Sequence, residues 1–234
     1  MSAPDSLPPP VTANVATDSL LAYWRARAEQ HTLDAYAGVP LSKFPEDLRV
    51  YEHLLWLAAP DVVIEIGTQF GGSALWFRDR LWTLERHGHV REPRVISIDV
   101  DQAPARHELK RFDQSGIVLV EGDVREPETP LRVEALLPPS GRCLVVEDSA
   151  HEYETTMAAL RGFARFVPPG GFMVVEDGCV DIDVLRLRPE WPRGVLPALQ
   201  DWLATPPGQE FEVRRDLELY GISCHPGGFL RRRD

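Results

Sequence analysis

Residues 62–73 read Val-Val-Ile-Glu-Ile-Gly-Thr-Gln-Phe-Gly-Gly-Ser, an apolar run that leads into a turn rich in glycine. The run is nearly continuous and rich in β-branched residues, as strands buried on both faces are. Glycines permit a tight turn and a close approach of the backbone to a ligand, and a helix that starts here offers unpaired N–H groups. The G-x-x-x-G-G spacing differs from the G-x-G-x-x-G of dinucleotide-binding enzymes. The segment therefore predicts a strand, a ligand-binding turn and a helix.

The same alternation of strand and helix continues along the chain. Further apolar runs, which predict strands, lie at residues 95–98, 117–120, 143–146 and 172–175. Amphipathic segments, which predict helices, lie at residues 71–87, 102–115, 128–137 and 152–166. A helix near 194–204 and two strands near 210–214 and 228–232 follow. This order is typical of a parallel sheet covered by helices. We predict an α/β fold with a doubly wound, mostly parallel, seven-stranded sheet and additional N-terminal helices.

The chain before this region has a different pattern. A proline-rich stretch comes first, followed by a helix that Thr17 or Asp18 can cap and that runs to about Gln30. A second helix begins near Pro45, with acidic residues in its first turn. The expected organisation is a flexible leader at 1–16, a helical cap at 17–58 and a ligand-binding domain at 59–234.

The composition excludes some classes of partner. The 234 residues contain 25 Lys and Arg against 36 Asp and Glu, which gives a formal net charge of −11. An acidic chain repels nucleic acid and anionic membranes, so we expect neither as a partner. No stretch approaches about 20 apolar residues, and the N-terminus lacks a secretory signal pattern. We therefore expect a cytoplasmic protein.

The cysteines and two loop histidines carry little signal in the sequence. Cys143, Cys179 and Cys224 lie in or beside apolar runs, and none forms a C-x-x-C pair. We expect buried thiols, with neither a disulfide framework nor a thiolate zinc site. His31 and His225 fall in expected loops without an evident partner, so surface or packing roles are expected.

Acidic residues follow the first three predicted strands. Glu65 precedes the glycine turn and suits a ligand with an ammonium group. Asp99 ends the second strand, where an acid can bind ribose hydroxyls; Asp101 is the alternative, or it caps the next helix. Asp123 follows the third strand and either meets an adenine amino group or lies in a surface turn.

The next two strands end in further ionisable residues. Asp148 and His151 follow one strand, and Glu176 and Asp177 follow the other. Because the carboxyl ends of neighbouring parallel strands meet at one edge of the sheet, these carboxylates can converge there. Such a cluster favours Mg²⁺, with Mn²⁺ as a substitute, unless some of the acids cap helices or pair with arginine. His151 has a pKa suited to accepting a hydroxyl proton, so it is the candidate base.

Together these motifs resemble the cephalosporin hydroxylase/rhamnosyl O-methyltransferase family of S-adenosylmethionine-dependent enzymes. The resemblance spans residues 36–233 and rests on residues 38–40, 45–48, 63–68, 71–73, 95–101, 148–151 and 176–177. It implies a class I methyltransferase sheet with an antiparallel last strand. It also implies acceptors with sugar or other hydroxyl groups of natural products, and a tendency to form homo-oligomers.

The resemblance assigns roles to individual residues. S-adenosylmethionine would lie at the glycine turn, at Glu65, Gly67, Thr68, Gly71 and Ser73, with Asp99 on its ribose. Asp123 is added to this set by its place after the third strand. Mg²⁺ would lie on Asp148, Glu176 and Asp177. His151 in the D-x-x-H turn would be the catalytic base, beside Asp148.

The sequence thus predicts a Mg²⁺-dependent O-methyltransferase acting on a small-molecule hydroxyl acceptor. Residues 180–193 and the first helix, with Tyr23 and Trp24, are the candidate acceptor lid by position alone. One alternative is a catechol-type O-methyltransferase, although that group typically has an Asp-Asn pair where this chain has Glu176-Asp177. The other is a non-catalytic, cofactor-binding helper of an oxygenase.

Overall fold

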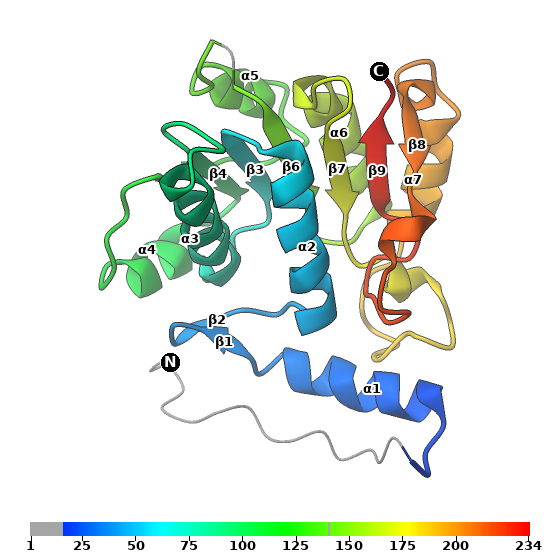
Figure 1. Cartoon of the computed structure of the whole chain (residues 1–234). Helices are drawn as coiled ribbons and strands as arrows, with labels where there is room; N and C mark the ends of the chain where they lie inside the picture. The colour runs from blue at the N-terminus through cyan, green and yellow to red at the C-terminus, as the bar shows by residue number, and fades with distance from the viewer. Residues whose placement is uncertain (1–15, 140) are drawn as a thin grey trace.

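The computed structural model describes residues 16–139 and 141–234, and its centre is a seven-stranded sheet with the order β5-β4-β3-β6-β7-β9-β8 (Figure 1). Neighbouring strands from β5 to β7 are parallel, and β9 is antiparallel to both β7 and β8. The predicted fold class and the antiparallel last strand are confirmed. The strands are β3 (Val62–Ile66), β4 (Arg94–Asp99), β5 (Ile117–Glu121), β6 (Cys143–Glu147), β7 (Phe172–Val175), β8 (Phe211–Val213) and β9 (Phe229–Arg232).

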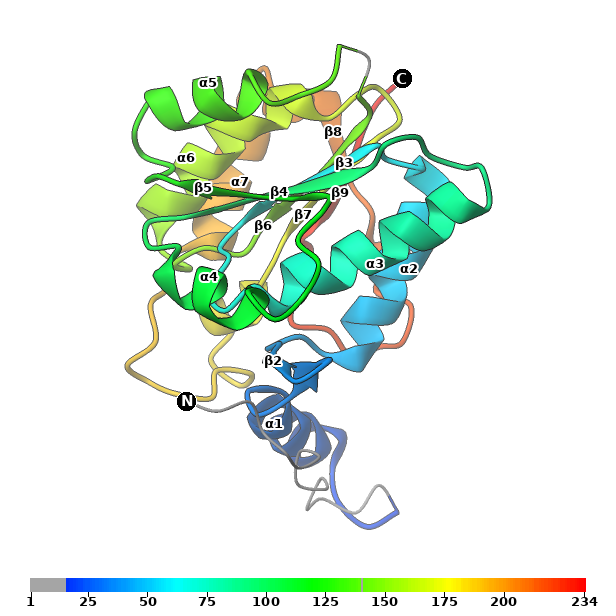
Figure 2. The same ribbon diagram turned by 90° about the vertical axis from the view of Figure 1, so that its left-hand side faces the viewer.

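Helices cover both faces of the sheet (Figure 2). Alternate residues of β3 explain this: Ile64 packs in the cluster that contains Phe163 and Trp202, whereas Val63 packs in the cluster that contains Tyr51 and Phe77. Every residue of β3 is buried, as its unbroken apolar pattern predicts. The helices after β3 are α3 (Gly72–Arg86), α4 (Ala103–Leu109), α5 (Glu128–Glu134), α6 (Tyr153–Phe163) and α7 (Val195–Leu203), with 3-10 turns η1 (Ala164–Phe166), η2 (Gly178–Asp181), η3 (Gly208–Glu210) and η4 (Arg215–Leu217).

The N-terminal part comprises α1 (Leu20–His31), a short hairpin of β1 (Ala35–Tyr36) and β2 (Val39–Pro40), and α2 (Pro45–Ala58). The predicted cap of the first helix is wrong by one or two residues, because the Ser19 hydroxyl accepts the N–H of Ala22. The hairpin was not predicted from the sequence. Its two-residue turn has positive φ at both positions, the geometry of tight hairpins.

The two N-terminal helices occupy different places. α2 packs beside α3 on one face of the sheet, through Tyr51 and Leu54. α1 lies beyond the edge of the sheet, at the ends of the parallel strands (Figure 1). The predicted leader falls outside the described residues, except for Ala16. Among the helices that the structure describes, none is long and apolar enough to cross a membrane.

Candidate functional site

A cleft of about 720 Å³ lies at the carboxyl edge of the parallel strands. This is where open α/β sheets bind their ligands, and the volume lies in the range of small-molecule sites. The turn Gly67–Ser73 and Asp99 form one end, here called the glycine end. Asp148, His151 and Asp177 form the other, here called the acidic end. α1 and the loop between η2 and α7 supply the outer wall.

Backbone contacts fix the glycine end. The N–H groups of Thr68 and Gln69 both donate to Oδ2 of Asp99, at 2.9 Å. Gly67 has φ +104°, and a Cβ there would lie 1.8 Å from the carbonyl oxygen of Asp148. Only glycine fits, because the turn crosses the backbone that follows β6. One tight turn therefore joins the two ends of the cleft.

The predicted ligands at the glycine end divide into two groups. Gly67, Thr68, Ser73, Asp99 and Asp123 line the cleft, whereas Glu65 and Gly71 are not among its described lining residues. Glu65 is fully buried below the turn, where its Oε2 accepts from Ser97 Oγ at 2.5 Å. Burial raises the pKa of Glu65 to about 7. Its position suits support of the turn rather than direct contact with a ligand.

Two other predicted acids have protein partners. Asp101 accepts the N–H of Ala103 at 2.9 Å, at the start of α4, and is not among the described residues of the cleft lining. Asp101 therefore caps the helix that follows it, which was one of its two predicted roles. Asp99 is the acid that lines the cleft. Asp123 lines the cleft, but both of its carboxylate oxygens accept hydrogen bonds from the guanidinium group of Arg125. This pairing lowers the pKa of Asp123 and occupies the oxygens expected to meet an adenine.

At the acidic end, three predicted residues converge. His151 Nε2 lies 3.3 Å from Oδ1 of Asp148 and 3.1 Å from Oδ2 of Asp177. His151 and Asp177 both have left-handed backbone conformations, with φ of 59° and 58°, a region that is uncommon for residues other than glycine but that Asp and His enter more readily than most. Such strain is typical of positions whose side-chain direction matters.

Mutual charge controls protonation of this group. Burial alone would lower the pKa of His151, but Asp177 and Asp148 raise it well above its ordinary value. Burial would raise the pKa of Asp177, but the charge of His151 lowers it instead. Without another cation, His151 therefore carries the positive charge between two carboxylates.

Glu176 is not among the described lining residues of the cleft. Its side chain is 2 % exposed and accepts from Lys43 Nζ, at 2.7 Å on each oxygen, and from the Tyr51 hydroxyl at 2.5 Å. Lys43 also donates to Oδ2 of Asp148 at 2.8 Å. Burial opposes the charge of Lys43, but Asp148 and Glu176 raise its pKa. The structure thus brings Asp148 and Asp177 together in the cleft and places Glu176 beneath them.

Sequence reasoning missed the partners of these acids. Lys43 was not singled out, although it is one of two lysines in the chain and stands alone in an apolar stretch. His225 is not a surface residue: it is 2 % exposed, and its Nδ1 accepts the N–H of Asp177 at 3.0 Å. Its Nε2 lies 3.6 Å from both Asp47 and Glu176. The sequence holds no local signal for these contacts, because His225 is 48 residues from Asp177.

The acidic end fits a small cation that prefers oxygen ligands. The candidate ligand atoms of Asp148, His151 and Asp177 all lie within 4.8 Å of one another. Mg²⁺ is commonly bound through one or two carboxylates and keeps several waters, so Asp148 and Asp177 suffice as protein ligands. Glu176, already bound by Lys43, fits a supporting position better.

Comparison with known proteins identifies the family. The profile described as "Rhamnosyl O-methyltransferase/CmcI" matches residues 29–233. The chain belongs to this family. The predicted family is therefore confirmed, and with it the predicted enzyme class, an O-methyltransferase.

Relatives within and around the family agree with this assignment. A rhamnosyl O-methyltransferase of Mycobacterium leprae is 26 % identical over 204 residues, which cover 85 % of this chain and 82 % of that protein. The rhamnosyl O-methyltransferase of Mycobacterium tuberculosis H37Rv is 23 % identical, over 86 % of this chain and 79 % of that protein. A CmcI structure described as an Mg–SAM form superposes with a TM-score of 0.61, at 22 % identity, over 97 % of this chain and 90 % of that one. This likeness confirms the fold.

In this member of the rhamnosyl O-methyltransferase/CmcI family, the outer wall combines two distant segments. Trp24 of α1 lines the cleft, as do Leu185 and Trp191 of the loop that follows η2. Tyr23, the other predicted aromatic, is not among the described lining residues. Arg25 ties the two segments together by donating to the carbonyl of Val184 at 3.1 Å. The wall thus lines the cleft with apolar and aromatic side chains.

Proposed function

We propose that this protein transfers the methyl group of S-adenosylmethionine to a hydroxyl group of a natural product, in a reaction that requires Mg²⁺. The observation that carries the proposal is the convergence of Asp148, His151 and Asp177 in the same cleft as the turn Gly67–Ser73. The residues there fit a cation and a proton acceptor. The adjoining turn offers backbone close to a ligand.

The residues divide the work as follows. Gly67, Thr68, Ser73 and the carboxylate of Asp99 bind the methyl donor, with Asp99 on its ribose. Asp148 and Asp177 hold Mg²⁺, which lowers the pKa of the acceptor hydroxyl when it is bound. Lys43 fixes the direction of Asp148 through its 2.8 Å contact. Holding donor and acceptor in one orientation lowers the barrier by removing the need for a chance encounter.

His151 accepts the hydroxyl proton at Nε2. This nitrogen lies 3.3 Å from Oδ1 of Asp148 and 3.1 Å from Oδ2 of Asp177. Without a metal, those carboxylates raise the pKa of His151 well above its ordinary value, against the effect of burial. A cation held by Asp148 and Asp177 would neutralise their charge and bring the pKa of His151 back toward its ordinary value, so that the ring could accept a proton near neutral pH.

A sugar hydroxyl is the proposed acceptor group. The relatives named as rhamnosyl O-methyltransferases support a deoxysugar. Trp191 lines the outer wall and offers aromatic surface that suits the apolar face of such a ring, whereas Trp24 is only 5 % exposed. Residues 180–193 and α1 then serve as the acceptor wall.

The test is methyl transfer from labelled S-adenosylmethionine to a panel of rhamnosides, other glycosides and catechols. Transfer to glycosides that EDTA abolishes and Mg²⁺ restores is the expected result. Transfer to catechols alone would favour the catechol-type alternative. Binding of S-adenosylhomocysteine without transfer to any acceptor would favour a helper of an oxygenase.

The roles of the acidic end are tested with His151→Ala. We expect this variant to bind S-adenosylhomocysteine normally and to lose at least about 100-fold in rate. His107→Ala is the control, because His107 lies on the exposed side of α4. Full activity of His151→Ala between about pH 6 and pH 9 would show that another group takes the proton.

A further inference from the structure

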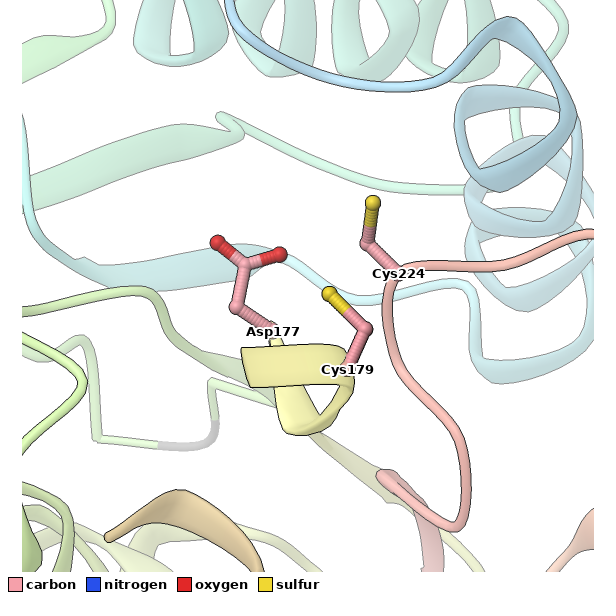
Figure 3. A group of neighbouring side chains, drawn as sticks. All are labelled: Asp177, Cys179 and Cys224. Carbon is pink, nitrogen blue, oxygen red and sulfur yellow. The ribbon is translucent and has the colours of Figure 1, made fainter. Parts of the chain in front are cut away.

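Two cysteines far apart in the sequence lie beside Asp177. Cys179 is in η2 and Cys224 is in the loop before β9, and both are buried. Their sulfurs and a carboxylate oxygen of Asp177 all lie within 4.8 Å of one another. Figure 3 shows the three side chains gathered around the turn η2. The expectation of no thiolate metal site rested on spacing along the sequence. The fold instead supplies the second cysteine from another segment.

Hydrogen bonds from backbone N–H groups fix the segments that carry these side chains. The N–H of Cys179 donates to the carbonyl of Cys224 at 3.1 Å, which joins the two segments directly. The N–H of Cys224 donates to Oδ2 of Asp47 at 3.0 Å. The N–H of Asp177 donates to Nδ1 of His225 at 3.0 Å. The three groups are therefore held together in advance of any ligand.

The cluster is open to ions from the cleft, because Asp177, Cys179 and Cys224 all line it. Two sulfurs and one carboxylate oxygen form a donor set of the kind that zinc takes in sites with a fourth, open position. Zn–S bonds of about 2.3 Å in tetrahedral geometry place two sulfurs about 3.8 Å apart. Since the donor atoms already lie within 4.8 Å, closing the site needs movements of about 1 Å or less.

We propose that Asp177, Cys179 and Cys224 form a second metal site, selective for thiophilic divalent cations such as Zn²⁺. Hard cations such as Mg²⁺ do not favour thiolate ligands, so the two neighbouring sites differ in preference. The regulatory consequence rests on the proposed function: Asp177 is common to both sites, and Zn²⁺ on the cysteines withdraws it from the acidic end. Zn²⁺ then inhibits methyl transfer by competing for a shared ligand.

The site itself is tested by titrating Cd²⁺ into the reduced, metal-free full chain. We expect thiolate-to-cadmium charge-transfer absorption that saturates at one equivalent. Cys179→Ala and Cys224→Ala are each expected to lose it. Cys143→Ala is the matched control, since Cys143 is a buried thiol in β6 outside this cluster, and it should keep the full signal. Absence of the absorption in the wild type, or its persistence in both cluster variants, would overturn the proposal.

Competition is read with Mn²⁺ by electron paramagnetic resonance, without any methyl acceptor. One equivalent of Zn²⁺ should weaken Mn²⁺ binding at least about tenfold in the wild type, and much less in Cys179→Ala. Simultaneous binding of both ions at full affinity would contradict the shared ligand. Failure of the wild type to bind Mn²⁺ at all would remove the metal from the proposed function, whereas the Cd²⁺ absorption would still report the cysteine site.

Discussion

At one end of the cleft, the backbone N–H groups of the turn Gly67–Ser73 donate to the end of the neighbouring strand β4, whereas at the other end Asp148 and Asp177 are held by charged side chains. Thr68 and Gln69 donate to Asp99 from one strand end to the next. Lys43, by contrast, reaches Asp148 across 105 positions of the sequence. The geometry of the glycine end depends on contacts between adjacent strands. The geometry of the acidic end depends on contacts that only the assembled fold provides.

The difference indicates how each end will respond to change. Backbone geometry tolerates the loss of a polar side chain but not the addition of a Cβ. A buried charge network tolerates changes of shape but not the removal of one charge, because the partner is left unpaired in the interior. Single substitutions at the two ends test this difference.

Lys43→Met should have the largest effect. It leaves Glu176 and Asp148 without their buried cation, so we expect the free energy of unfolding to fall by about 3–5 kcal/mol. Urea denaturation near neutral pH measures it. The control is Lys110→Met, which changes the other lysine of the chain at an exposed position. A loss below about 1 kcal/mol for Lys43→Met would mean that the network carries little stability.

Gly67→Ala should come next, with a loss of about 3 kcal/mol. Its Cβ would meet the Asp148 carbonyl at 1.8 Å, in a backbone conformation with φ +104°. Gly88→Ala separates the two causes, because φ there is +77° and no atom lies within 4 Å. Denaturation of both variants gives the comparison. Equal losses would assign the whole effect to φ and none to the contact that joins the two ends.

Asp177→Asn should lower the rate of methyl transfer at least about 100-fold, because it removes a charged ligand from the acidic end. The rate is measured at saturating donor and Mg²⁺. Asp216→Asn is the control at an exposed acid on η4. Wild-type activity of Asp177→Asn would remove Asp177 from the proposed metal site.

Asp99→Asn should weaken the binding of S-adenosylhomocysteine about tenfold, through the lost charge opposite the ribose and the loosened turn. Asp101→Asn is the matched control two residues away, and we expect its dissociation constant to stay within about threefold of the wild type. Calorimetric titration measures both. The opposite ranking would move the ribose contact to Asp101.

Glu65→Gln should have the smallest effect at the cleft, within about threefold in the affinity for S-adenosylhomocysteine. The main effect of Glu65→Gln is expected in the dependence of the protein's stability on pH. Burial raises the pKa of Glu65 from 4.5 to about 7, so the folded protein binds this proton more tightly than the unfolded chain. The contribution of this proton to the stability of the folded protein is complete below pH 4.5 and is lost as the pH rises through about 7.

Glu65→Gln should therefore gain stability relative to the wild type as the pH rises from about 4.5 to about 8. Urea denaturation at both pH values measures the change. Glu147→Gln is the comparison variant. Burial also raises the pKa of Glu147, at the end of β6, to about 7, so the same gain of stability with pH is expected there. A large loss of donor affinity in Glu65→Gln would restore the predicted contact with the ligand.

The regular part of the fold followed from the sequence. Continuous β-branched runs predicted the strands, because only a sheet covered on both faces buries them completely. The hairpin at residues 35–40 was missed, since its strands are two residues long and carry no periodic pattern. The helix cap was placed one or two residues early because Thr17, Asp18 and Ser19 are all residues that cap helices.

Local sequence patterns were enough to establish which residues stand at the ends of the strands, because a strand and the turn after it are encoded by neighbouring residues. The strand pattern alone thus assigned Asp99, Asp148 and Asp177 to one edge of the sheet. The direction in which each carboxylate faces came from the tertiary structure, since it depends on charges from remote segments. Lys43 draws Glu176 below the cleft, and Cys224 meets Cys179, because burial forces each polar group to find a partner wherever the fold brings one.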